Sequence, residues 1–377
     1  MRATTAADEA AAAAVVTEDI RHIHAATASE LDTMAGKHVV LTGGGGFLGY
    51  ELVQALVAYN HGRPATSHIR VTVLDNFMRG IPAWLTGLEP GTVDLREHDV
   101  TRELPTDLGI VDYVIHAAGI ASPIYYRLHP IETMDANVVG LRRLLDRCVE
   151  QQQAGDPISG FLFFSSSEIY GDPPASEIPT RETYRGSVSC TGPRACYDES
   201  KRYGETLSVN FARQHGLPIT MARPFNNFGP GLKITDGRVI PDLARDILEG
   251  RDIVLLSDGS PTRTFCYVAD AVSGYLKVLV NGRPGEAYNI GVGHGEVSIL
   301  ELANRLRGLG HDLLGYQGVV SHGQSDEADY LVDNPTRRCP DISKAISDVG
   351  FAPSVELDEG LRRSLLWYAG NATGSAA

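Results

Sequence analysis

Cysteine is scarce in this chain, and the cysteines that are present show no pairing pattern. The 377 residues include five cysteines, and no two of them form a C-x-x-C motif. A disulfide framework needs paired cysteines, and structural zinc sites usually need closely spaced ones. We therefore expect reduced thiols in a cytoplasmic protein that holds no metal. The cysteines are Cys148, Cys190, Cys196, Cys266 and Cys339.

Long apolar runs and an excess of basic residues are also missing. No uninterrupted apolar stretch approaches the roughly 20 residues that a membrane-spanning helix needs. Lys and Arg number 33 against 47 Asp and Glu, which gives a formal net charge of −14. Proteins that bind nucleic acid usually carry a basic stripe or patch. We therefore expect neither nucleic acid nor a membrane as a partner.

The N-terminal segment has an unusual composition. Residues 1–16 are rich in alanine, but Asp8 and Glu9 interrupt the apolar stretch that a secretion signal would need. We expect these residues to form a disordered or weakly helical tail. Residues 17–35 show isoleucine, leucine and methionine at roughly helical spacing. This pattern predicts an added amphipathic helix that packs on the body of the protein or on a partner subunit.

Short apolar stretches alternate with helical patterns along the rest of the chain. Strands that alternate with helices form a parallel, doubly wound sheet, and such sheets bind ligands beyond the carboxyl ends of their strands. We therefore expect an α/β protein with a Rossmann-type sheet and a smaller C-terminal α/β lobe. The predicted strands lie at residues 38–43, 71–76, 93–100, 111–119, 160–171 and 218–229, and helices follow Gly49, span 132–152 and carry Tyr197.

A glycine-rich turn follows the first predicted strand. The stretch TGGGGFLG places Gly43, Gly46 and Gly49 in a G-x-x-G-x-x-G array between strand and helix. The first glycine allows the tight turn, the second lets the backbone approach a pyrophosphate, and the third lets the helix lie close to the strand. The free N–H groups of the helix N-terminus can then bind phosphates. The turn therefore predicts a dinucleotide site.

The carboxylate at the end of the second predicted strand indicates which dinucleotide binds. Asp75 suits the ribose hydroxyls and repels a 2′-phosphate, so the sequence favours NAD over NADP, although Arg79 nearby points the other way. Asp99 suits the adenine amino group. Further cofactor contacts are expected from Phe47, Leu48, Asn76, Val100, Ala117 and Ala118. The predicted division is a tail and added helix at 1–35, an NAD-binding domain at 36–230 that later segments rejoin in part, and a substrate-binding lobe at 231–370.

Tyr197 and Lys201 form the most informative pair in the chain. They are four residues apart in ACYDESKRYGETL and therefore share one face of the predicted helix. A lysine ammonium beside a tyrosine favours the phenolate, so we expect the pKa of Tyr197 to fall toward neutrality. Together with the glycine turn and the serine-rich stretch FFSSSEIYG, the pair predicts a nicotinamide-dependent enzyme.

In combination, these motifs resemble the nucleotide-sugar branch of the extended short-chain dehydrogenase/reductase family. The resemblance covers about residues 37–368. Within that branch, HAAGIASPIYYRLHPIET, SSSEIYGDP, TGPRACYDESKR and DGSPTRTF are most similar to UDP-glucuronate decarboxylases, also called UDP-xylose synthases. The resemblance implies a tightly held NAD, a UDP-sugar substrate and a homodimer built from the helices near 132–152 and 197–215.

The resemblance also implies roles for single residues. Tyr197 would take the proton from the sugar 4-hydroxyl as hydride leaves C4 for NAD, while Lys201 holds the nicotinamide ribose. Ser166 would hydrogen-bond O4, although many decarboxylases of the family carry threonine there. Pro224 would lie against the nicotinamide.

Three further residues separate the possible reactions. Family 4,6-dehydratases carry Asp-Glu where this chain has Ser167 and Glu168, and Ser-Glu resembles the decarboxylases. Arg263 matches an arginine that reaches a substrate carboxylate or phosphate. Oxidation of UDP-glucuronate at C4 gives a β-keto acid, which loses CO2 readily because the electrons flow into the C4 carbonyl. The expected catalytic residues are Tyr197, Lys201, Ser166, Glu168 and Arg263, and the expected substrate contacts are Ser122, Ser167, Asn226, Arg238, Val239, Leu255, Arg263 and Arg338.

The expected function is therefore NAD-dependent decarboxylation of UDP-glucuronate to UDP-xylose, with UDP-4-keto-xylose released if the intermediate escapes. Three alternatives stay open at this point. A 4-epimerase for UDP-glucuronate or a UDP-hexose shares Tyr197, Lys201 and Ser166, a 4,6-dehydratase lacks its acid here, and an NAD-bound scaffold would not need the tyrosine–lysine pair. The sequence distinguishes neither UDP from dTDP nor the fate of the hydride.

Overall fold

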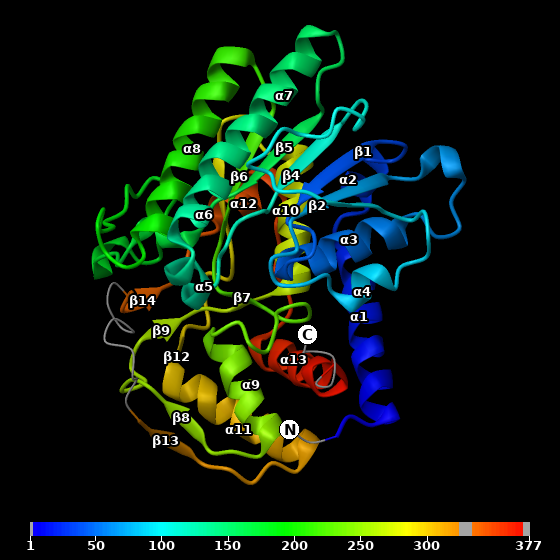
Figure 1. Cartoon of the computed structure of the whole chain (residues 1–377). Helices are drawn as coiled ribbons and strands as arrows, with labels where there is room; N and C mark the ends of the chain where they lie inside the picture. Colours follow the sequence, from blue (N-terminus) through cyan, green and yellow to red (C-terminus); the bar gives the residue numbers. More distant parts are fainter. Residues whose placement is uncertain (1–2, 324–333, 372–377) are drawn as a thin grey trace.

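A seven-stranded parallel sheet forms the centre of the protein (Figure 1). The structure is a computed structural model that describes residues 3–323 and 334–371. The strand order is β11-β6-β5-β4-β1-β2-β3, and every neighbouring pair is parallel, which confirms the predicted fold class. The strands are β1 (His38–Thr42), β2 (Arg70–Asp75), β3 (Asp94–Glu97), β4 (Tyr113–His116), β5 (Gly160–Phe164), β6 (Ile219–Pro224) and β11 (Ala287–Ile290).

Helices cover both faces of this sheet, as Figure 1 shows. One hydrophobic cluster joins the sheet to α3 (Phe47–Tyr59) and α10 (Val268–Asn281). A second cluster joins the opposite face to α7 (Leu141–Gln153) and α8 (Ala195–His215). Because both faces of the sheet are buried, its central strands consist of continuous apolar residues. This pattern allowed their prediction from the sequence. The strand order reverses between β1 and β4, where doubly wound sheets hold their ligands.

Short helices and turns connect these elements. The helical run before α7 continues from α6 (Pro130–Asp135) through a π-helical segment, η2 (Ala136–Gly140). Such π-helical segments occur frequently at functional sites. The remaining connections include η1 (Ala65–Ser67), α4 (Ala83–Thr86), α5 (Pro123–Leu128), η3 (Ser167–Tyr170) and η4 (Ala175–Glu177).

A second lobe lies below the carboxyl ends of the strands (Figure 1). Its helices are α9 (Val239–Glu249), α11 (Ile299–Leu314) and α13 (Leu357–Asn371). Its short strands are β7 (Asn227–Phe228), β8 (Ile253–Leu255), β9 (Thr262–Arg263), β10 (Cys266–Tyr267), β12 (Val297–Ser298), β13 (Val320–His322) and β14 (Arg337–Arg338). After residue 231, the elements α10, β11 and α12 (Ser343–Val349) pack against the first lobe. The exact limits of the two predicted domains stay a prediction.

The N-terminal segment corrects the sequence prediction. Helix α1 (Ala6–Ala26) begins within the stretch that was expected to be a tail, and α2 (Ala28–Thr33) follows it. Thr5 caps α1 with Asp8 in a capping box, and alanine is the best helix former, so local propensity and capping favour the helix. The helix lies on the body of the protein, where the carboxylate of Asp19 accepts a 2.8 Å hydrogen bond from Arg363 on α13.

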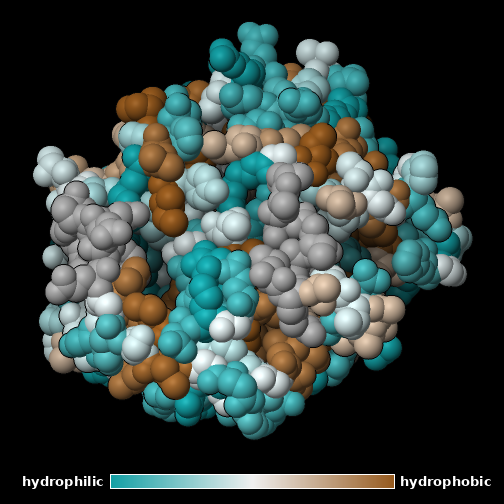
Figure 2. Space-filling model, turned by 60° about the horizontal axis from the view of Figure 1, so that its bottom comes forward, coloured by the Kyte–Doolittle hydropathy of each residue, from teal (hydrophilic) through white to brown (hydrophobic). Residues whose placement is uncertain are grey.

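The surface that carries the second lobe mixes hydrophilic and hydrophobic residues. Figure 2 shows this face with groups of hydrophobic residues interrupted by hydrophilic ones. Within residues 3–323 and 334–371, no helix is both long and apolar enough to cross a membrane.

Candidate active site

A cleft of about 1140 Å³ opens at the carboxyl ends of the strands, between the sheet and the second lobe. Loops after the six strands β1 to β6 line it, together with α8 and α9. Of the predicted site residues, the structure brings together Gly43, Gly46, Phe47, Leu48, Gly49, Asp75, Asn76, Asp99, Val100, Ala117, Ala118, Ser122, Ser166, Ser167, Glu168, Tyr197, Lys201, Pro224, Asn226, Arg238, Val239, Arg263 and Arg338.

Leu255 is the exception among the predicted site residues. It is buried in the hydrophobic core on β8, and its neighbour Leu256 lines the cleft instead. Successive side chains of a strand point to opposite faces. A prediction that is wrong by one residue therefore selects a side chain in the core instead of one that lines the cleft. The expected nucleoside contact of Leu255 is therefore wrong, because this side chain faces the core.

The glycine turn between β1 and α3 has no room for side chains. Gly43 has φ +75°, and a Cβ there would lie 2.6 Å from the backbone nitrogen of Ala118. A Cβ on Gly49 would lie 2.3 Å from the carbonyl oxygen of Gly44, so the start of α3 touches the turn directly. The N–H groups in the first turn of a helix lack intrahelical partners. This cradle therefore fits a pyrophosphate.

Asp75 shapes the adenosine end of the cleft. Its carboxylate accepts hydrogen bonds from the backbone N–H groups of Gly45 (2.9 Å) and Phe77 (2.8 Å). Burial raises the pKa of Asp75, while these two bonds lower it. A carboxylate has about four acceptor positions, so Asp75 can also receive ribose hydroxyls.

Arg79, the residue that pointed toward NADP, is engaged elsewhere. Its guanidinium donates a 3.1 Å hydrogen bond to Asp236 and lies 4.3 Å from the centre of the Tyr125 ring. Both contacts direct the guanidinium toward Asp236 and Tyr125, although Arg79 itself lines the cleft. The residues at this end of the cleft therefore fit NAD.

Tyr197 and Lys201 lie on the buried face of α8, as the spacing predicted. The Lys201 ammonium donates a 2.7 Å hydrogen bond to the carbonyl oxygen of Phe164, at the end of β5, and lies 5.6 Å from the centre of the Tyr197 ring. This contact fixes α8 against the strand that carries the serine-rich stretch.

The structure contradicts the expected fall in the pKa of Tyr197. Burial raises the pKa of Tyr197 to about 12, and its hydrogen bond with Ser166 and the charge of Arg238 only partly oppose this. Burial also lowers the pKa of Lys201 to about 7. The charge of Lys201 favours the Tyr197 phenolate, but the cost of removing both groups from water is larger.

The end of β5 positions the next two predicted residues. The hydroxyl of Ser166 accepts a 3.1 Å hydrogen bond from the N–H of Glu168 and so caps η3. This turn aims the Glu168 carboxylate at three arginines. Glu168 forms ion pairs with Arg194 and Arg338. Burial would raise the pKa of Glu168, but these guanidiniums, together with that of Arg263, hold it well below its usual range.

Arg263 differs from the other two arginines. Its guanidinium donates to the carbonyl oxygens of Thr262 (2.8 Å) and Thr336 (3.2 Å). Within the described ranges it makes no ion pair with a carboxylate. Burial and the neighbouring charge of Arg338 lower the pKa of Arg263 to about 10. Its other terminal nitrogen donates a 2.5 Å hydrogen bond to the carbonyl oxygen of Pro335, so oxygens of the protein hold the guanidinium at the cleft wall.

The predicted substrate residues beside this cluster are held by the protein itself. The Ser122 hydroxyl donates a 2.6 Å hydrogen bond to the carbonyl oxygen of Asp236, and Arg238 lies 3.1 Å from the Asp236 carboxylate. Asn226 has φ +43° and donates a 2.9 Å hydrogen bond to the carbonyl oxygen of Thr264. Their contacts with substrate stay predictions.

Three residues that contact or adjoin α8 were not among the predicted site residues. Arg194 lies three positions before Tyr197, and that helical spacing was the available signal. The ring of Tyr126 stacks on that of Tyr197, with centres 5.3 Å apart and planes 13° apart. Asn137, on η2, donates a 2.9 Å hydrogen bond to Ser200, and its side-chain oxygen finds no partner in the part of the chain that the structure describes. No sequence pattern indicated Asn137.

Comparisons with known proteins agree with this geometry. Residues 39–291 match the NAD dependent epimerase/dehydratase family. The chain is 36% identical over 327 residues to UDP-glucuronic acid decarboxylase 6 of Arabidopsis thaliana, covering 86% of each chain. It is 36% identical over 336 residues to UDP-glucuronic acid decarboxylase 1 of Xenopus tropicalis, covering 88% of this chain and 72% of the relative.

Solved structures show the same fold. The UDP-glucose 4-epimerase of Thermotoga maritima, solved with UDP-glucose, superposes with a TM-score of 0.74 at 25% identity, over 88% of this chain and 98% of that one. The dTDP-glucose 4,6-dehydratase of Streptomyces venezuelae, solved with NAD bound, has a TM-score of 0.74 at 26% identity, over 89% and 98%.

Proposed function

Because this chain belongs to the NAD dependent epimerase/dehydratase family, we propose that it decarboxylates UDP-glucuronate to UDP-xylose through a 4-keto intermediate. The observation that carries the proposal is the arginine cluster around Glu168, which adjoins the Tyr197–Ser166 pair. The decarboxylases among the relatives support it, since two are 36% identical over most of the chain.

The cluster suits an acidic sugar better than a neutral one. Arg263 is 8% exposed and lines the same cleft as Tyr197. Among the described residues this guanidinium donates to backbone and amide oxygens and to no carboxylate, so an incoming carboxylate would supply the missing negative charge. A neutral hexose offers no such group near the arginines.

The first chemical step depends on Tyr197. In the bound enzyme, NAD would accept the hydride from C4 of the sugar and later return it. Tyr197 would accept the proton of the 4-hydroxyl, and Ser166 would hold the same oxygen. Because burial raises the pKa of Tyr197 to about 12, the base needs nearby positive charge, which Lys201 and the nicotinamide ring would supply.

The second step is loss of CO2 from the 4-keto acid. The electrons released from the carboxylate flow into the C4 carbonyl, so the protein has to hold the enolate and allow C5 to gain a proton. Glu168 is held ionised by Arg194 and Arg338, so it is not the resting proton donor. Its role here is to orient the two arginines, and a water is the proton source that we propose for C5.

The residue before Glu168 distinguishes this reaction from a dehydration. A 4,6-dehydratase of the family needs an acid at position 167, where this chain has Ser167, which is 3% exposed. A hydroxyl group is too weak an acid to protonate a departing 6-hydroxyl.

Product analysis across substrates tests the proposal. Purified protein with NAD would be incubated separately with UDP-glucuronate, UDP-glucose and dTDP-glucose, and the nucleotide sugars identified by chromatography and mass spectrometry. We expect UDP-glucuronate alone to react, with loss of CO2. A product of unchanged mass would identify an epimerase, and loss of water from dTDP-glucose would identify a dehydratase.

We also propose a cytoplasmic homodimer. All five cysteines are free thiols, which supports a reducing compartment. Large apolar side chains are exposed along the adjoining elements α5, α6, η2 and α8, which include the two predicted dimer helices. They are Leu128, Ile131, Met134, Val139 and Tyr203, each between 37% and 66% exposed. Light scattering after gel filtration would give the mass, and Tyr203→Glu should shift a dimer toward monomer.

A further inference from the structure

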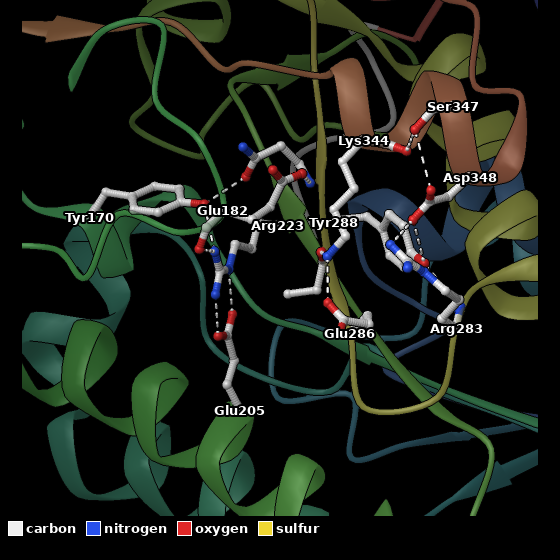
Figure 3. A network of polar contacts seen from close by, with 12 residues as sticks. Tyr170, Glu182, Glu205, Arg223, Arg283, Glu286, Tyr288, Lys344, Ser347 and Asp348 are labelled. Carbon is white, nitrogen blue, oxygen red and sulfur yellow. Dashed lines mark hydrogen bonds and ion pairs between the residues drawn. The ribbon is translucent and has the colours of Figure 1, made fainter.

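A buried ion pair lies behind the catalytic residues, outside the cleft. Arg223 on β6 donates two parallel hydrogen bonds to the carboxylate of Glu205 on α8, of 2.7 and 2.6 Å. Figure 3 shows the guanidinium between Glu205 and Tyr170. Neither residue lines the cleft, so neither can touch the cofactor or the sugar.

Glu205 ties the catalytic helix to the strand end. Tyr197, Lys201 and Glu205 follow one another at intervals of four residues and therefore share one face of α8. The carboxylate of Glu205 accepts a 2.5 Å hydrogen bond from the hydroxyl of Ser165. Ser165 directly precedes Ser166, whose hydroxyl lowers the pKa of Tyr197. Movement of Glu205 would therefore change the distance between Ser166 and Tyr197.

The other side of Arg223 ties the same unit to η3. Arg223 donates a 2.6 Å hydrogen bond to the hydroxyl of Tyr170, the last residue of η3, and a 3.0 Å bond to the carbonyl oxygen of Glu182. The Tyr170 hydroxyl donates in turn to the side chain of Asn289 on β11, at 2.8 Å. Since η3 carries Glu168, Arg223 connects both halves of the catalytic site.

We propose that Arg223 and Glu205 are positioning residues that set the Ser166–Tyr197 distance and the orientation of Glu168 during oxidation at C4. The inference rests on the proposed function for its kinetic test. Arg223 has five donors in a fixed planar arrangement; two of its hydrogen bonds reach α8, one reaches η3, and a fourth reaches the carbonyl oxygen of Glu182. Lysine keeps the charge and cannot keep this geometry.

A purely structural role is the competing explanation, and physical arguments separate the two. Buried ion pairs contribute little net stability compared with apolar side chains of similar volume, because desolvation offsets the attraction. A stabilising anchor would also not need to join Ser165 and Tyr170, which flank the catalytic turn on both sides. Two of the residues that the network joins, Ser165 and Tyr170, lie on either side of the turn that carries Ser166 and Glu168, as positioning requires.

Arg223→Lys is the direct test, and Arg283→Lys is its matched control. Arg283 pairs with Asp348 beside the Tyr288 hydroxyl, also drawn in Figure 3, but its side chain is 63% exposed and outside the cleft. For Arg223→Lys we expect kcat with UDP-glucuronate to fall about 10-fold, with KM within about twofold, since small misplacements reduce rates strongly. For Arg283→Lys we expect kcat to stay within about twofold.

The isotope effect separates positioning from loss of folded protein. With UDP-glucuronate deuterated at C4, poorer alignment should make hydride transfer more rate-limiting and raise the isotope effect on kcat. A smaller folded fraction would lower kcat without changing the isotope effect, and that result would overturn the proposal. If Arg223→Lys does not fold, Tyr170→Phe removes only one hydroxyl and should show a smaller change in the same direction.

A titration without sugar keeps this inference separate from the proposed function. In the NAD-bound protein, the phenolate absorbance of Tyr197 would be obtained by subtracting the same protein with Tyr197→Phe. Because the Ser166 bond lowers the pKa of Tyr197, a loosened network should raise it in Arg223→Lys, while Arg238, Glu168 and Asp198 keep their charges. An unchanged pKa overturns the inference, even if no nucleotide sugar reacts.

Discussion

Replacement of Glu51 by methionine should stabilise this protein. Glu51 lies in the second turn of α3 and is 0% exposed. Neither of its carboxylate oxygens has a hydrogen-bond partner among the residues that the structure describes. A buried polar group without a partner costs about 1–3 kcal/mol. Methionine has a similar length and no such group, so Glu51→Met should recover most of this energy.

The expected gain depends on pH, and its sign follows from the pKa. Burial, with the nearby charge of Asp19, raises the pKa of Glu51 well above its usual 4.5. The folded state therefore binds a proton that the unfolded state has lost, and this contribution to stability falls as the pH rises through the window above 4.5. The variant lacks this dependence, so its advantage should be larger at pH 8 than at pH 5.

Thermal unfolding at the two pH values measures the effect. With about 2.1 cal/mol/K per residue of unfolding entropy, 1–3 kcal/mol corresponds to roughly 1–4 °C in a chain of this length. Glu51→Gln, which removes the ionisation and keeps an unpartnered polar group, should gain less. A lower midpoint for Glu51→Met at pH 8, or an equal gain at both pH values, would refute the reasoning. NAD affinity should not change, because the Glu51 side chain does not line the cleft.

Three further substitutions address the site. Tyr197→Phe should abolish oxidation at C4 while NAD still binds, as followed by NADH absorbance and calorimetry; full activity would remove the base assignment. Gly204→Ala places a Cβ 2.4 Å from the ring of Phe163, so α8 must shift; we expect a loss of about 1–3 kcal/mol in urea unfolding and a lower kcat. Glu168→Gln should slow CO2 release more than 4-oxidation in single-turnover measurements, and an equal loss in both steps would contradict its role.

The motifs that could be predicted were those with local causes. The glycine turn, Asp75 at the end of β2 and the Tyr197–Lys201 spacing each satisfy a local requirement, and the structure brings them to one cleft. Glycine positions were readable because a Cβ would collide with nearby backbone, as at Gly49. Such constraints appear directly in the sequence.

The features that were missed depend on the balance between burial and neighbouring charges, or on contacts between residues that are far apart in the sequence. The pKa of Tyr197 rises because burial outweighs the neighbouring charges, and a spacing pattern contains no information on burial. Arg223 and Glu205 come from different elements, so their pairing appears only once α8 lies against the sheet. In α1, the capping box of Thr5 and Asp8 was a local signal that the alanine-rich composition obscured.

Release of labelled carbon tests the central claim most directly. UDP-glucuronate carrying ¹³C in its carboxylate would be incubated with the purified protein and NAD, and both the gas and the nucleotide sugars would be followed by NMR. We predict one labelled CO2 for each molecule of UDP-xylose or UDP-4-keto-xylose that forms. Label retained in a new isomer of the starting sugar would contradict the account and identify an epimerase.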